Sequence, residues 1–257
     1  MGSQMAADDA VMANTGMRPF HELLQEEFDR ASPASKRDRT RARVRIATAA
    51  ELSKVSYHNL RLQDICAHAQ IALGTFYLHF KTKQEVTADI LSQYTRSLWH
   101  NAPRIAHVAD HYQGLLMVNT YYVKSFEANS SLMRCLLQPD QDTPEFANIW
   151  QQSNRKWSDR AIKMMLQSRA SGVVTKNDAH FLAHTLGCMV DALLLSAYVT
   201  KDPAVVRADY SPARIAEVVT LIWYKSVYVE AAGWSPARTG SQSNGEPKQV
   251  KGRRRGG

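Results

Sequence analysis

The sequence has little cysteine and, over most of its length, little glycine. Its three cysteines, at positions 66, 135 and 188, lie far apart in 257 residues. An odd number at these spacings excludes a disulfide framework and a CxxC metal site, and it favours a reducing cytoplasm. Between residues 36 and 234, glycine occurs only at positions 74, 114, 172, 187 and 233. This region has no Gly-rich phosphate loop and no defensible nucleophile–base pair, so an enzyme is the least supported class.

Long apolar runs are also missing. The N-terminus has no basic segment followed by an apolar one, so no signal peptide is expected. The most apolar stretch, residues 186–195, is short and contains Asp191, so we expect no membrane span. Histidines pair at i, i+4 at 107/111 and 180/184, without the neighbouring ligands of a metal centre. The sequence therefore predicts no metal site and no cofactor.

The apolar spacing in residues 36–234 is helical. Leu62, Ile65, Cys66 and Ala69 follow i, i+3, i+4, i+7, and the same spacing recurs near residue 218. Strand alternation bounded by turn residues is absent there, so the sequence predicts an all-α fold of about nine helices. Their expected ranges, with caps, are about 37–54, 62–69, 72–80, 82–102, 111–128, 131–138, 143–172, 177–202 and 211–233.

The charge is distributed unevenly along the chain. The net charge of +8 divides into −4 for residues 1–35, +7 for 36–83, zero for 84–234 and +5 for 235–257. The first segment is expected to be a mostly disordered extension with one short amphipathic helix before Pro33, and the last to be a disordered basic tail. A small polyanion-binding domain (36–83) attached to a larger neutral domain (84–234) is the organisation that this pattern predicts.

Residues 62–80 predict two short helices joined by the tight connection at 69–72. Their apolar residues can face a common core with the preceding helix, which leaves Leu73, Gly74, Thr75, Tyr77 and His79 on the outer side. This arrangement is typical of a helix-turn-helix, whose second helix enters the major groove of DNA. The run from Leu62 to Ala69, followed by Ile71-Ala-Leu-Gly-Thr-Phe-Tyr-Leu-His-Phe-Lys-Thr-Lys, resembles the tetracycline-repressor (TetR/AcrR) family. The resemblance covers residues 40–90 and implies an N-terminal DNA-binding domain with a C-terminal helical bundle for ligand binding and dimerisation.

Side-chain chemistry suggests roles for the candidate DNA-binding residues. Lys83 is expected to hold a phosphate together with helix N–H groups, while Tyr77 and His79 resemble phosphate contacts of the family. Gln63 can pair with adenine. The complete set is Arg39, Arg41, Arg43, Arg61, Gln63, Leu73, Gly74, Thr75, Tyr77, His79 and Lys83. The alternative is a solvated basic helix with an ordinary core helix behind it.

Four positions depart from the family pattern. Gln70 stands where the turn usually carries glycine, so a left-handed backbone there would be costlier. Arg61 and Ala72 replace the usual hydroxyl caps of the two helices, and Ser56 replaces a glycine. These changes affect the fine geometry, and so the operator sequence, more than DNA binding itself.

The neutral domain is rich in aromatic residues and methionine. Trp150 and Trp157 lie seven apart on one helical face with Asn154 between them, a pattern that suits a pocket for a small, largely apolar ligand. The candidate ligand-binding residues are Trp99, Met117, Tyr121, Tyr122, Trp150, Asn154, Trp157 and Met189. The alternative is that these side chains only fill the core.

The last two predicted helices are apolar on more than one face. We expect them to pack against their copies in a two-fold dimer. Asp191, Leu194, Val218 and Ile222 are the candidate interface residues, with Asp191 near the contact because a carboxylate in an apolar helix needs a partner or water.

These observations support one function over two others. The first hypothesis is a cytoplasmic, dimeric regulator that binds double-stranded operator DNA, most simply a repressor released by a small-molecule effector. The second is an architectural protein that uses the same DNA-binding domain, has no inducer, and binds a protein partner through its body. An enzyme ranks third.

Overall fold

The computed structural model describes residues 17–31, 35–105, 108–139, 141–167, 176–207 and 210–228. Every regular element within these residues is a helix, which confirms the all-α prediction. The expected helices at 62–69 and 111–128 coincide with the observed ones. The first 16 residues, the basic tail, and the expected helix ends at Gly172 and Gly233 lie outside the described residues.

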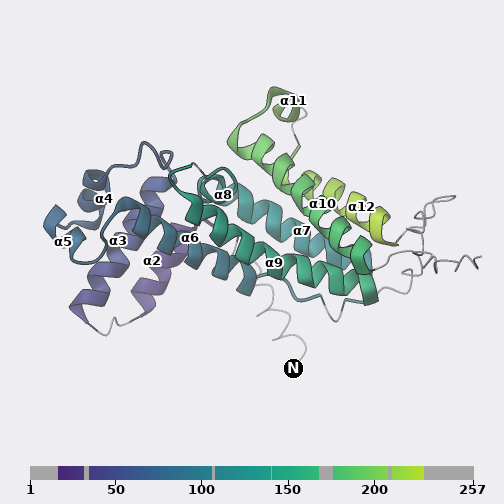
Figure 1. Ribbon diagram of the computed structural model, residues 1–257, viewed down its shortest axis with the longest axis horizontal. Helices are drawn as coiled ribbons and strands as arrows, with labels where there is room; N and C mark the ends of the chain where they lie inside the picture. The colour runs from purple at the N-terminus through teal and green to yellow at the C-terminus, as the bar shows by residue number, and fades with distance from the viewer. Residues whose placement is uncertain are drawn as a thin grey trace, which may run out of the picture.

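The first half of the chain forms a small head and the helix that leaves it. Its helices are α2 (Phe20–Arg30), α3 (Lys36–Leu52), α4 (Leu62–Ala69), α5 (Leu73–Tyr77) and α6 (Lys83–His100). In Figure 1 the helices α2 to α5 lie at one end of the molecule, and α6 runs from them into the body. Thr82 caps α6 by accepting a hydrogen bond from the amide of Glu85, whose carboxylate accepts one from the amide of Lys81.

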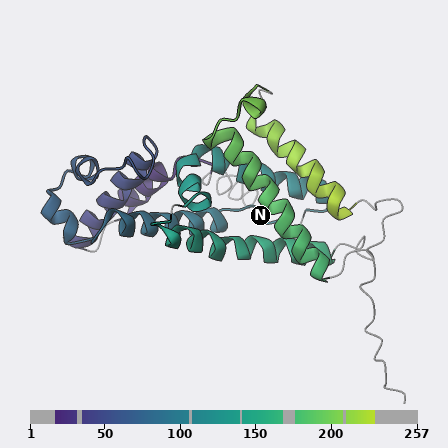
Figure 2. The ribbon, with the colours of Figure 1, turned by 45° about the horizontal axis from the view of Figure 1, so that its top comes forward.

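The body is a bundle of long helices. It contains α7 (His111–Ala128), α8 (Ser130–Leu137), α9 (Pro144–Gln167), α10 (Lys176–Leu194), α11 (Pro203–Val206) and α12 (Pro212–Tyr228), with the π-helix η1 (Leu195–Val199) continuing α10. Figure 2 shows α10 and α12 diverging from the turn that carries α11. α12 packs mainly on α7, and α10 on α9.

Two short helices, α2 and α11, add to the nine that the periodicity predicts. α11 begins at Pro203, with the Asp202 carboxylate accepting a hydrogen bond from the Ala204 amide. This Asp-Pro pair is a helix-start signal, which we interpreted only as the end of the preceding helix. α2 forms at the segment where an amphipathic helix was expected.

α2 packs against both the head and the body. Phe20, Leu23 and Leu24 are buried, and the Phe20 ring contacts the ring of Tyr94 on α6 edge to face, with centroids 5.4 Å apart. The buried Asn129, between α7 and α8, accepts a hydrogen bond from the Phe20 amide at 2.7 Å and donates one to the Arg18 carbonyl. The amide of Asn129 therefore caps the N-terminus of α2 and fastens it to the body.

Candidate functional site

The α4–α5 pair forms as its apolar pattern predicts, except that α5 ends at Tyr77, three residues before the expected end at Phe80. Ile65, Ala69, Phe76 and Phe80 are buried in the core of the head. Gln70 joins the two helices in the left-handed conformation, with φ 52° and ψ 51°, which confirms the expected strain at this position. The N-terminus of α5 has no side-chain cap, because Ala72 offers no oxygen there.

The outer face of α5 exposes apolar and aromatic side chains. Tyr77 is 52% exposed and Leu78 is 73% exposed, and Leu73 is exposed beside them. A short helix gains nothing for its own fold by exposing such side chains, so this face is a candidate contact surface. Thr75 is half-buried on the same helix.

Gly74 is exposed at the second residue of α5. A Cβ added there would meet nothing within 4 Å. The fold itself therefore does not require glycine, and a glycine in a helix costs about 0.5–1 kcal/mol relative to alanine. The backbone at Gly74 is therefore open to close approach by another molecule.

Lys83 is positioned differently from the expectation. Its ammonium group donates hydrogen bonds to the carbonyls of Tyr57 and Leu60, both at 3.0 Å, and lies over the Tyr57 ring. Burial lowers the pKa of this ammonium. The group thus lies against carbonyls of the α3–α4 loop rather than against helix N–H groups, and its phosphate contact remains a prediction.

The arginines of α3 differ in what they contact. Arg41 folds back over the ring of Phe80, at 4.3 Å from the centroid, and donates to the His79 carbonyl. Arg43 donates to the side-chain oxygen of Gln70 at 3.3 Å. Arg39 is exposed, as are Arg61 and Gln63 at the start of α4. Of the predicted arginines, Arg39 and Arg61 are therefore the most accessible to a polyanion.

His79, one of the predicted phosphate contacts, is half-buried. Its Nδ1 is buried and has no hydrogen-bond partner in the described part of the chain. Burial lowers the pKa of the imidazole, and the charges of Arg37 and Arg41 lower it further. This environment favours the neutral form of the His79 imidazole.

A salt bridge that sequence reasoning missed joins the head to α6. The Asp89 carboxylate accepts from Arg45 at 2.7 Å and lies 3.6 Å from a nitrogen of Arg41. Gln93, one turn further along α6, donates to the same carboxylate. α6 is thereby tied to α3.

The body contains a half-open cavity of about 980 Å³ between α7, α9, α10, α12 and the end of α6. Of the eight predicted ligand-binding residues, five line it, namely Trp99, Tyr122, Trp150, Asn154 and Trp157. The Trp99 and Trp157 rings meet edge to face with centroids 5.2 Å apart. This volume is at the upper end of the range for drug-sized ligands.

The other three predicted ligand-binding residues do not line the cavity. Met117 is 46% exposed on the outer side of α7. Tyr121 is buried in the core, and its hydroxyl donates to the Leu98 carbonyl at 2.9 Å. Met189 packs against the core. Neighbouring positions on one helix point about 100° apart, so Tyr121 and Tyr122 cannot share a face.

Asp191 lines the cavity, and its predicted place near a dimer contact stays a prediction. Its carboxylate accepts a hydrogen bond from the Tyr122 hydroxyl at 2.6 Å. Burial raises the pKa of Asp191 to about 6, which the hydrogen bond partly offsets. Burial, followed by the charge of Asp191, also raises the pKa of Tyr122 well above its usual value. The expected partner of this carboxylate is thus a phenol on α7.

The remaining predicted interface residues divide between core and surface. Leu194 is fully buried within its own chain, and its place in a dimer contact stays a prediction. Ile222 is exposed and Val218 is half-buried on α12. The most exposed large apolar side chain of α10 is Phe181, at 75%. The stretch Asp178–Val199 is long and apolar enough to cross a membrane, by length and composition alone. Of its most apolar 18-residue window, 22% is buried within the chain.

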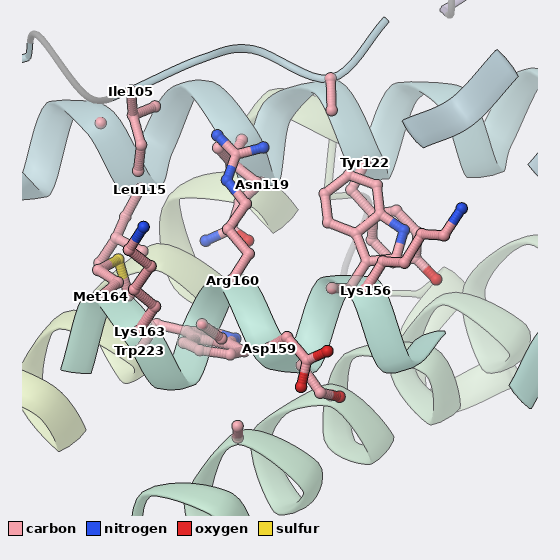
Figure 3. Close-up of a pocket in the computed structure, with 18 of the residues that line it drawn as sticks. Ile105, Leu115, Asn119, Tyr122, Lys156, Asp159, Arg160, Lys163, Met164 and Trp223 are labelled. Carbon is pink, nitrogen blue, oxygen red and sulfur yellow. The ribbon is translucent and has the colours of Figure 1, made fainter. Parts of the chain in front are cut away.

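Sequence reasoning also missed several cavity residues. Figure 3 shows Arg160 reaching from α9 across the cavity toward α7, beside Asn119, with Trp223 of α12 on the same wall. The Arg160 guanidinium donates to the carbonyl of Pro103. A signal existed, since Arg160 follows Trp157 by three residues and so shares its helical face.

Comparisons with known proteins match both parts of the chain. The family described as "Bacterial regulatory proteins, tetR family" matches residues 46–90, and the C-terminal domain of the transcriptional regulator EthR matches residues 117–229. The HTH-type transcriptional regulator EthR of Mycolicibacterium smegmatis is 24% identical over 71% of this chain and 84% of its own length. Its namesake in Mycobacterium tuberculosis is 23% identical over 67% of this chain and 79% of its own.

Solved structures show the same fold. A TetR-family transcriptional regulator from Mesorhizobium loti superposes with a TM-score of 0.57 at 15% identity, over 75% of this chain and 98% of its own. The fatty acid degradation regulator FadR from Bacillus halodurans gives a TM-score of 0.58 at 15% identity, over 74% of this chain and 96% of its own.

Proposed function

The chain belongs to the TetR family of bacterial transcriptional regulators, and we propose that it is a dimeric repressor whose operator complex dissociates when a small, largely apolar ligand fills the cavity. The observation that carries the proposal is the combination of an exposed reading helix, α5, with a large aromatic cavity in the body. α6 connects the two, with Lys83 at its head end and Trp99 on the cavity wall.

The DNA contact in this proposal comes from α5 and the exposed basic residues around it. Tyr77, Thr75 and the backbone at Gly74 would approach the major groove, and Arg39 and Arg61 would neutralise phosphates. Lys83 and Arg41 have internal partners, so we assign them first to holding the head in shape.

Fluorescence anisotropy with duplexes from the gene's own upstream region tests the DNA contact. Arg39→Ala should weaken binding and reduce the slope of log K against log salt by about one per subunit. Arg214→Ala, an exposed arginine of α12 that pairs with Glu217, is the matched control and should leave the slope unchanged. Absent or salt-insensitive binding to every upstream fragment would reject the proposal.

The dimer contact in this proposal is the exposed apolar face of α10 and α12. Phe181, Leu221 and Ile222 lie on these two helices, and α10 is too apolar to remain mostly uncovered in water. A second copy related by a two-fold axis would cover this face and set two reading helices about one DNA turn apart, roughly 34–36 Å. Such a regulator acts in the cytoplasm, with α10 covered by protein rather than by lipid.

Sedimentation analysis tests the dimer. Phe181→Asp together with Ile222→Asp should produce monomers that still contain native helix but bind operator DNA more weakly. Met117→Asp is a control, since Met117 is exposed on α7. Monomeric wild-type protein at micromolar concentration would contradict the two-fold arrangement.

A further inference from the structure

The cavity wall contains hydrogen-bond donors that have no acceptor in the described part of the chain. The indole Nε1 atoms of Trp157 and Trp223 are both buried, and both residues line the cavity. A buried N–H group without a partner costs about 1–3 kcal/mol. A ligand that carries acceptor oxygens would supply such a partner if the ring moved on binding, and a pure hydrocarbon would not.

A cation on the same wall points to the charge of that ligand. Arg160 is half-buried, and the partner of its guanidinium in the described residues is the neutral carbonyl of Pro103. Burial lowers the pKa of Arg160, and the neighbouring charge of Arg104 lowers it further. Two guanidinium groups facing one cavity repel each other, and an anion between them would relieve that repulsion.

The acidic residues of the wall do not neutralise Arg160. Asp110 caps α7, with its carboxylate accepting from the amides of Tyr112 and Gln113. Asp191 accepts a hydrogen bond from Tyr122. Arg160 reaches α7 beside Asn119, three residues before Tyr122 (Figure 3). Asp159 is exposed on α9, next to Arg160 in sequence, and forms no ion pair with it in the described chain.

We propose that the cavity binds an amphipathic organic acid, with its carboxylate on Arg160 and its apolar body along Trp157, Trp99, Leu115 and Met164. This inference rests on the proposed sensing role of the cavity and adds the class of effector to it. A planar guanidinium binds a carboxylate through two parallel hydrogen bonds. The aromatic and aliphatic wall takes up the rest of the molecule.

Isothermal titration of the full-length protein without DNA tests the head group. Dodecanoate, kept below its critical micelle concentration, is compared with dodecanamide and with dodecyltrimethylammonium. Dodecanoate should bind at least about tenfold more tightly than the amide, because a hydrogen bond to a charged group is stronger than a neutral one. The ammonium compound should bind more weakly than either.

Arg160→Met separates the charge from the shape of the cavity. The variant should lose about tenfold in dodecanoate affinity while its dodecanamide affinity stays the same, which shows that the cavity is intact. Arg155→Met is the matched control, since Arg155 is exposed on the same helix and does not line the cavity. Trp157→Phe, which keeps a ring and removes the N–H group, should weaken dodecanoate binding by a smaller factor.

Three outcomes would overturn the inference: equal affinity for dodecanoate and dodecanamide, tighter binding of the ammonium compound than of dodecanoate, or no binding of any probe. The ammonium result would instead assign the site to a cation held by Asp191. None of these measurements involves DNA, so they are independent of operator binding. If the wild-type protein binds dodecanoate but no operator DNA, the repressor proposal is refuted and the inference about the ligand stands.

Discussion

Replacing Asp191 by asparagine should stabilise the protein at neutral and alkaline pH. The carboxylate lies in a largely apolar cavity, where its one hydrogen bond comes from Tyr122 at 2.6 Å. Burial disfavours the charged form and raises the pKa from 3.8 to about 6. Asparagine keeps an oxygen that can accept the phenol proton and carries no charge.

The sign and size of the effect follow from proton linkage. The folded state holds this proton more tightly than the unfolded state, so ionisation of Asp191 costs no stability below its unfolded pKa of 3.8. The cost grows between about pH 4 and pH 6 and is complete above pH 6. At about 1.4 kcal/mol per pKa unit it amounts to about 3 kcal/mol. The new amide N–H groups need partners in the cavity, so the net gain above pH 7 should be about 1–3 kcal/mol.

Urea unfolding followed by tryptophan fluorescence measures this gain. Wild type and Asp191→Asn are compared at one protein concentration, because a dimer's stability depends on it. The difference should be small at pH 4 and reach its full size by pH 7. Asp142→Asn, which removes an exposed carboxylate, controls for the change of net charge. An equal difference at both pH values, or a destabilisation that grows with pH, would refute the reasoning.

Three further substitutions test the head and its attachment. Gly74→Ala should stabilise the protein by about 0.5–1 kcal/mol in urea unfolding and yet weaken operator binding, because the new methyl group meets open space in the protein alone. Gln70→Gly should gain up to about 1 kcal/mol by relieving the left-handed backbone, less the hydrogen bond to Arg43, and an unchanged or lower midpoint would count against strain there. Asn129→Ala leaves the Phe20 amide buried without an acceptor, which should lower the free energy of unfolding by about 1–3 kcal/mol and speed proteolysis within α2. An unchanged rate of proteolysis would mean that the apolar face of α2 is enough to hold this helix.

Local patterns predicted the positions of several helices and one special backbone conformation. α4 and α7 have their expected limits, and the left-handed backbone at Gln70 was expected from the family resemblance, in which this turn position usually carries glycine. The cavity residues on α9 followed from helical spacing alone, since Trp150, Asn154 and Trp157 recur at intervals of three and four.

Contacts between distant segments could not be predicted in this way. Asp191 was expected at a subunit interface because a carboxylate in an apolar helix needs a partner or water. Its partner, Tyr122, is 69 residues away in sequence and could not be identified from local patterns. Leu194 lies on the same apolar helix as Phe181, and periodicity alone cannot say which side of such a helix is covered within the chain. Arg41 was interpreted as a DNA contact from its charge, yet its guanidinium stacks on Phe80.

The same distant contacts explain how a ligand can act on DNA binding. α6 has 18 residues and is about 27 Å long at 1.5 Å per residue, so a tilt of about 5° at one end moves the other by about 2 Å. Trp99 places one end of this helix on the cavity wall, while Asp89 binds it to α3 through Arg45. In the proposed mechanism α2 would oppose this tilt, because its N-terminus is held by Asn129 in the body while the helix packs on α3. A ligand releases the operator only if it binds the tilted form more tightly, and a hundredfold preference supplies about 2.7 kcal/mol for that motion. Weakening the α2 attachment should therefore lower the preference that the ligand needs.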